Sequence, residues 1–201
     1  MKKHALSLLL ACCLVPLAHG AEAAGSALEG HYESECTKIA EEFYTRDVMD
    51  VGPGSRTLKV RYAKAMYGAD GCKAADLLGL LELPDGSWKL EGEQRIDGRA
   101  VQRVAVVIPA GTLRVTYARA GHVEESAAGW HIKTLSGEQV TVEKEGAMSS
   151  ELDLRWLSPE GLLYVGQQAS PRSPNGYLTQ LDLDNPLRKL AVPSYASPAS
   201  K

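Results

Sequence analysis

The sequence predicts an all-β protein in which an antiparallel meander of about eight strands closes as a barrel or a sandwich, with one short N-terminal helix. Two observations support this. Apolar and polar side chains alternate along most segments between residues 57 and 166, and such alternation is typical of strands with one buried face. Turn-forming residues separate these segments at a spacing of roughly ten residues, which is typical of strands joined by short hairpins.

The strongest strand signal lies in residues 77–118, where three turn signals separate four apolar runs. In the run from Trp88 to Ile96 every second residue is charged. One face is therefore expected to be wet, and the face that carries these two end residues is expected to be buried. Asp97-Gly98 follows this run and supplies the positive φ angles that a two-residue hairpin turn needs.

Residues 35–45 differ from the rest, because their apolar positions recur at the spacing of a helix. Charged residues fall on the other side, and Ser34 precedes the segment as an N-cap. The pattern predicts a helix from Glu35 to Thr45. The apolar positions are Cys36, Ile39, Ala40, Phe43 and Tyr44.

Further strands are expected on both sides of the central stretch. Apolar and polar side chains alternate in residues 57–63, before the central stretch, and in residues 112–118, at its end. They also alternate in residues 152–156, after it. Ser136-Gly137-Glu138 separates two short apolar runs and predicts another hairpin. Residues 162–166 form a last apolar run after a turn signal.

The N-terminus has the features of a secretory signal peptide over residues 1–20. It combines a basic start, an apolar run too short for a membrane span, and small residues at a cleavage site. The predicted location is the periplasm, with secretion as an alternative. In another alternative Cys12 is lipidated after cleavage and anchors the protein to a membrane. Residues 21–28 are expected to form a disordered leader.

Cleavage changes the charge and the cysteine count. It would remove Lys2 and Lys3 from the 22 basic residues and leave all 25 acidic ones, so the formal charge changes from −3 to about −5. An acidic chain offers no electrostatic surface for DNA or RNA, so nucleic acid is not an expected partner. The two remaining cysteines, Cys36 and Cys72, are expected to form a disulfide in an exported chain, with two buried thiols as the alternative.

The length of the mature chain indicates one domain. We expect a single β-barrel domain over residues 29–169. Residues 170–201 are expected to form an extended or partly disordered tail, because prolines gather there and periodicity is weak. No later segment has the length and apolar character of a membrane span, and the protein is expected to be a monomer.

The sequence contains none of the motifs that mark a hydrolase nucleophile, a phosphate loop or a zinc site. The segment 122–131 carries histidines and glutamates that could meet across a hairpin, but solvated loop residues are expected because the spacing is not diagnostic of a metal site. The segment from Asp182 to Asn185 is expected to cap a turn, since it lacks the glycine and the distal glutamate of a calcium loop. No enzymatic activity, metal or cofactor is therefore expected.

Five aromatic residues fall on the expected inward faces of strands and are the candidate ligand-binding residues. Aromatic side chains normally fill the core of a small barrel, which is the first interpretation. In the second interpretation some of them line a ligand cavity. The five are Trp88, Tyr117, Trp130, Trp156 and Tyr164.

Gly30-x-Tyr32, the meander of strands, and a cysteine near the first strand that is bonded further along the chain resemble the lipocalin-like (calycin-type) barrels of exported bacterial proteins. Lipocalins carry Gly-x-Trp on the first strand, whereas this chain has tyrosine there. The resemblance covers most of residues 28–168 and implies a closed barrel with an apolar pocket. The expected function is binding of a small apolar molecule. The alternative is an inhibitor or immunity protein that binds an envelope enzyme.

Overall fold

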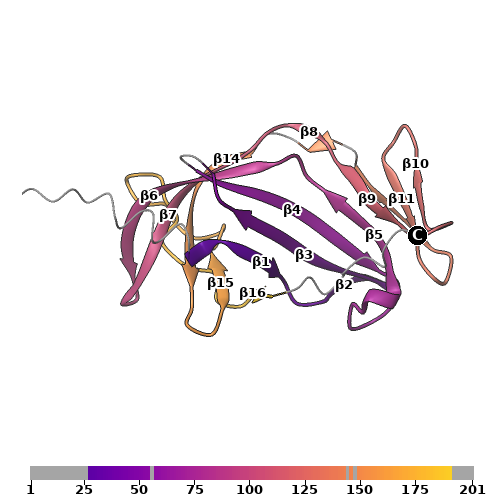
Figure 1. Ribbon diagram of the computed structural model, residues 1–201, viewed down its shortest axis with the longest axis horizontal. Coiled ribbons are helices and arrows are strands. Elements are labelled where there is room, and N and C mark those ends of the chain that lie inside the picture. The colour runs from indigo at the N-terminus through magenta and orange to yellow at the C-terminus, as the bar shows by residue number, and fades with distance from the viewer. Residues whose placement is uncertain (1–26, 55–56, 144, 147–148, 192–201) are drawn as a thin grey trace, which may run out of the picture.

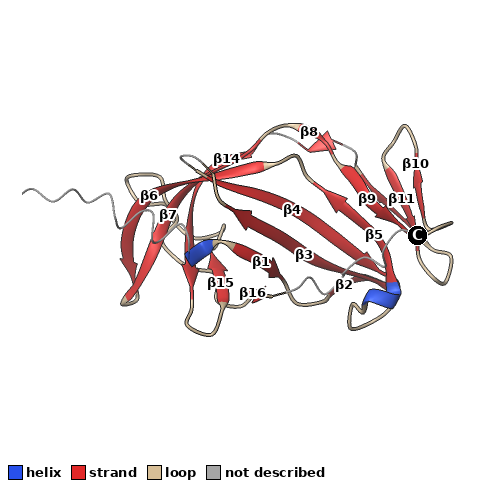
Figure 2. Cartoon of the chain, viewed as in Figure 1, coloured by secondary structure: helices blue, strands red, loops and turns tan. Residues whose placement is uncertain are grey.

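The computed structural model describes residues 27–54, 57–143, 145–146 and 149–191 and shows an all-β chain (Figure 1, Figure 2). Eight strands form a closed antiparallel barrel in which successive members of the set lie side by side. The first and last of them pair and close the barrel. The predicted meander and barrel are therefore confirmed. The barrel strands are β1 (Gly30–Glu33), β3 (Phe43–Gly52), β4 (Leu58–Tyr67), β6 (Gly86–Ile96), β7 (Arg99–Ile108), β14 (Ser149–Leu157), β15 (Leu162–Val165) and β16 (Leu187–Leu190).

The first half of β3 and the second half of β4 extend beyond the barrel and form the middle of a second sheet (Figure 1). Strand β2 (Thr37–Ala40) lies on one side of this pair. On the other side lie β5 (Leu77–Glu82), which follows a short 3-10 turn at Ala74–Asp76, and then β9 (Arg114–Ala118). The long β3–β4 hairpin therefore belongs to both sheets.

A separate three-stranded sheet covers one face of this second sheet. Its apolar side chains pack against Phe43, Met66 and Leu81. A further short pair of strands joins the segments before and after it. The covering strands are β10 (Val123–Glu125), β11 (Trp130–Lys133) and β12 (Gln139–Val142), and the short pair is β8 (Gly111–Thr112) with β13 (Glu145–Gly146).

The predicted helix from Glu35 to Thr45 is wrong, because this segment forms the β2–β3 hairpin. Its turn lies at Glu41 and Glu42, and Glu42 has a φ angle of +48°. Apolar cores cover both faces of the hairpin, since Phe43 packs under the β10–β12 sheet and Tyr44 packs on the opposite side. Adjacent apolar residues that serve two faces imitate the spacing of a helix. Among the described residues, no helix has the length and apolar character needed to cross a membrane.

Cys36 and Cys72 form the predicted disulfide, with Cα atoms 5.7 Å apart. The bond joins the start of β2 to the loop between β4 and β5. Cys72 is buried there against Val48 and Ala65 of the second sheet. In the chain-entropy model, a bridge that closes a loop of this length stabilises the fold by about 3–4 kcal/mol.

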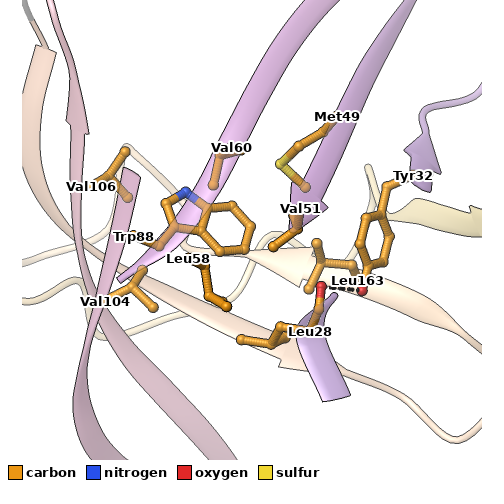
Figure 3. Close-up of a cluster of buried hydrophobic side chains, with 10 residues drawn as sticks. All are labelled: Leu28, Tyr32, Met49, Val51, Leu58, Val60, Trp88, Val104, Val106 and Leu163. Atoms are coloured by element: carbon orange, nitrogen blue, oxygen red, sulfur yellow. Dashed lines mark hydrogen bonds between the residues drawn. The ribbon is translucent and has the colours of Figure 1, made fainter. Parts of the chain in front are cut away.

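Buried apolar side chains fill one end of the barrel (Figure 3). Trp88, the largest of them, has no exposed surface. The hydroxyl of Tyr32 donates a hydrogen bond to the carbonyl oxygen of Leu28 over 2.8 Å. Leu28 belongs to the predicted leader but is buried in this core, so the packed chain reaches back at least to this residue. Residues 21–26 of the leader and the predicted signal peptide, with Cys12, lie outside the described residues.

Part of the predicted tail belongs to the barrel, and another part packs on its outer side. Strand β16 lies between β1 and β15 and completes the ring of strands. Before it, Tyr177 and Leu178 are buried against Val101 and Leu154 on the outer side of the barrel wall. Residues 192–201 of the predicted tail lie outside the described chain.

Asp97 and Gly98 form the predicted turn between β6 and β7, with φ angles of +48° and +78°. A β-bulge beside Gly92 shifts the alternation of β6 before this turn is reached. Trp88 consequently faces the barrel core, whereas Ile96 packs in the outer cluster. The expectation that these two residues share a face is therefore wrong.

Candidate binding cavity

A cavity of about 660 Å³ lies where the barrel opens towards the second sheet. Strands of the barrel, strand β5, and the segments 34–37 and 182–187, which lead into β2 and β16, contribute most of its walls. Most of the lining side chains are apolar. They include Met49, Met66, Leu81, Leu113, Val165 and Leu187.

The inward face of β4 explains the position of the cavity. Val60 packs in the barrel core, and Met66 packs in the core under the β10–β12 sheet. Tyr62 lies between them on the same face and opposite Met49 of β3, and both line the cavity. The cavity therefore lies between two packed cores that share one pair of long strands.

Two charged residues of β14 are buried inside the barrel. Asp153 is 2% exposed and Arg155 is 4% exposed. Asp153 pairs with Val104 of the barrel core, and Arg155 pairs with Val165 of the cavity wall, so both charged side chains point inward. Nη1 of Arg155 donates to Oδ2 of Asp153 over 2.5 Å and to the carbonyl oxygen of Leu154 over 2.7 Å.

The carboxylate of Asp153 is also held by the backbone. Its Oδ1 accepts from the N–H of Leu154 over 2.7 Å and from the N–H of Gly166 over 3.0 Å. A Cβ atom at Gly166 would lie 2.3 Å from this oxygen, so the close approach requires glycine. With three donors, the buried carboxylate is well satisfied, as a buried charge must be.

Arg155 lies in the cavity floor against two aromatic rings. Its guanidinium is 4.5 Å from the ring centroid of Trp88, and Trp88 Nε1 donates to the hydroxyl of Tyr62 over 2.6 Å. Burial raises the pKa of the Tyr62 hydroxyl, which therefore stays protonated. Nε of Arg155 is buried and has no hydrogen-bond partner among the described residues. Arg155 thus holds a buried N–H donor that the described residues do not satisfy.

Acidic side chains surround the rim. Glu35, Asp182 and Asp184 line the cavity, and none of them forms an ion pair within the described chain. Lys64 also lies at the rim but pairs with Asp47 over 2.7 Å. The rim therefore carries a net negative charge.

The turn that carries two of these carboxylates is capped as predicted. Oδ1 of Asp182 accepts from the N–H of Asp184 over 3.1 Å and from the N–H of Asn185 over 3.2 Å. This side chain–backbone arrangement is typical of aspartate in turns. It fixes the rim just before β16 begins.

The structure does not bring the five candidate aromatic residues together, and none of them lines the cavity in the described chain. Trp88 lies in the barrel core behind Arg155. Tyr117 and Trp130 pack in the two clusters on opposite faces of the second sheet. Trp156 and Tyr164 stack on each other with ring centroids 5.1 Å apart, against the outer cluster.

Sequence reasoning missed the polar floor of the cavity. Alternation along residues 152–156 distinguishes two faces of a strand but does not say which face is inward. Charged residues normally lie on the protein surface, so the charges of Asp153 and Arg155 predict that this face of the strand faces solvent. We find no other signal in the sequence that would have reversed this assignment.

The segment 122–131 forms part of the covering sheet. Nδ1 of His122 lies 2.7 Å from the carbonyl oxygen of Lys133, and Nδ1 of His131 lies 3.0 Å from the Thr141 hydroxyl. Within the described ranges, no group of three or more His, Cys, Asp or Glu residues is arranged to hold a metal ion.

A second buried polar group lies on the outer side of β1. His31 is 9% exposed, with Nδ1 2.7 Å from Asp50 Oδ1 and Nε2 2.9 Å from Glu33 Oε1. Burial lowers the pKa of His31, but the hydrogen bonds and charges of the two carboxylates raise it to about 9 overall. Arg46 pairs with Glu33 and Arg61 pairs with Asp50, so the group is a charged network that joins β1 to β3 and β4.

Comparisons of the chain with protein-family profiles, with curated proteins and with solved structures found no match. Its function is therefore argued from the fold and the cavity.

Proposed function

We propose that this protein is an exported, lipocalin-like barrel that binds a small, mainly apolar molecule in the cavity at the barrel opening. The observation that supports this is a cavity of about 660 Å³ whose walls hold more apolar than polar side chains and whose floor holds a buried polar group. Small-molecule sites in proteins typically have volumes of roughly 300–1,000 Å³ and a lining of this kind. The proposal includes export because a signal peptide is expected at residues 1–20.

The cavity walls are held by the fold itself. The pairing of β1 with β16 closes the barrel, and the Cys36–Cys72 disulfide ties the second sheet. A preformed site loses little conformational freedom when a ligand binds, which favours affinity. The alternative function, a protein-binding inhibitor, needs no cavity, so the cavity favours a small ligand.

The test is titration with N-phenyl-1-naphthylamine, an uncharged dye whose fluorescence rises in apolar surroundings. Val165→Phe replaces a small side chain of the cavity wall by a bulky aromatic one. The matched control Val107→Phe makes the same change on β7, where Val107 is 40% exposed. We expect saturable binding by the natural protein and the control, and binding weaker by about tenfold or more for Val165→Phe. Circular dichroism verifies that both variants fold. Absence of saturable binding, or equal binding by all three proteins, would contradict the proposal.

A further inference from the structure

We propose that the cavity accepts uncharged lipophilic molecules that carry an oxygen acceptor, such as a long-chain alcohol or ether, and that it excludes the corresponding carboxylates. This inference rests on the proposed function, because it concerns the ligand of the same cavity. Two separate features carry it: the donor in the floor and the charge of the rim.

The first feature is an unsatisfied hydrogen-bond donor in the cavity floor, which a ligand with an acceptor atom would complement. Arg155 lines the cavity, is 4% exposed, and leaves its Nε–H without a partner among the described residues. A guanidinium can only donate hydrogen bonds, and a buried donor without an acceptor is costly. Nε itself has almost no exposed surface, so a ligand oxygen at the floor satisfies this donor once the surrounding side chains shift slightly.

The cavity floor has no unbalanced positive charge that would favour an anionic ligand. Asp153 already neutralises Arg155 through the 2.5 Å ion pair. A second carboxylate would leave the buried site with a net negative charge, and the neighbouring Trp88 and Tyr62 supply no further positive charge to offset it. A hydroxyl, ether or carbonyl oxygen accepts the same hydrogen bond without this cost.

The rim acts in the same direction. A ligand must pass Glu35, Asp182 and Asp184, whose charges no ion pair offsets in the described chain. Like charges at the opening of an apolar cleft raise the energy of an approaching anion, because the low-dielectric walls focus the field. An uncharged head group does not meet this barrier.

The first experiment compares dodecan-1-ol, dodecyl methyl ether and dodecanoate as competitors of the bound dye at about pH 8, where the acid is ionised. The alcohol and the ether should compete equally well, within about threefold, because the floor needs only an acceptor. Dodecanoate should bind at least about tenfold more weakly than the alcohol. Dodecanoate that competes as well as the alcohol, or an ether that does not compete, overturns the inference.

A second experiment tests whether the charge of the rim, rather than the shape of the cavity, disfavours the carboxylate. With affinities expressed relative to that for the alcohol, the second test uses the rim variant Glu35→Gln/Asp184→Asn, which removes two exposed charges. The variant should raise the affinity for dodecanoate by about threefold or more, and added salt should narrow the alcohol-to-acid gap of the natural protein. A gap that responds neither to the variant nor to salt overturns the inference. If the dye and all three competitors fail to bind, the proposed function fails; if the dye binds but the carboxylate is not disfavoured, the inference alone fails.

Discussion

Asp153 and Arg155 form a buried ion pair inside the barrel, with Nη1 of Arg155 2.5 Å from Oδ2 of Asp153. The two residues are neighbours on the inward face of β14, and backbone amides, a backbone carbonyl oxygen and an aromatic ring supply further contacts. A buried pair of this kind adds little net stability compared with apolar residues of similar size, but each charge is tolerated only while the other is present. The pair is therefore both a structural constraint on the barrel and the polar part of the cavity.

Removal of one partner should be strongly destabilising. In Arg155→Met the carboxylate of Asp153 remains buried without its counter-charge, so we expect the free energy of unfolding to fall by about 3–5 kcal/mol. The measurement is urea unfolding of the natural protein and the variant, followed by tryptophan fluorescence.

The double variant Asp153→Asn/Arg155→Met is the control for this experiment. The asparagine oxygen can still accept from the N–H groups of Leu154 and Gly166, but no unpaired charge remains. The double variant should therefore be more stable than Arg155→Met alone. A single variant that loses less than about 1 kcal/mol, or a double variant that is worse than it, would contradict the account of the pair.

Because of the His31 network, the stability of the folded protein should fall as the pH rises above neutrality. The pKa of His31 is about 9 in the folded protein against 6.5 for an ordinary histidine. A raised pKa means that the protonated ring stabilises the fold fully below pH 6.5 and loses this effect as the pH rises through about 9. We expect the free energy of unfolding to fall by about 3 kcal/mol across this interval.

His31→Gln tests the assignment by urea unfolding at a series of pH values. Glutamine cannot carry the charge that faces Asp50 and Glu33, so the variant should be less stable at the lower end of the interval, and its stability should change less with pH. His122→Gln changes a half-buried histidine outside this network and should keep the pH dependence of the natural protein. Parallel curves for the natural protein and His31→Gln would show that His31 is not the group responsible.

Local features of the sequence predicted much of the barrel. Alternation located most strands, and Asp97-Gly98 located a hairpin turn, because a type of turn and a half-buried strand each depend on a few neighbouring residues. The Cys36–Cys72 bond was predicted from the expected export of the chain and the count of cysteines. The error over residues 35–45 arose where two cores cover both faces of a hairpin and alternation disappears.

The cavity could not be predicted in the same way. Its position depends on β3 and β4 leaving the barrel to enter a second sheet, which is a property of pairing between distant strands. Its floor depends on which face of β14 is inward, and the charges of Asp153 and Arg155 suggested the opposite of what the structure shows. Trp156 and Tyr164, which looked like inward residues, consequently lie on the outer side.

The measurement that tests the central claim most directly is an NMR titration of isotope-labelled methionine methyl groups with dodecan-1-ol. Met49 of β3 and Met66 of β4 both line the cavity, and replacement of each by leucine assigns its signal. A molecule bound in the cavity should shift both signals along one saturable curve, and Val165→Phe should weaken that response. If neither signal moves while the alcohol is present in excess, the cavity is not a binding site and the proposed function is wrong.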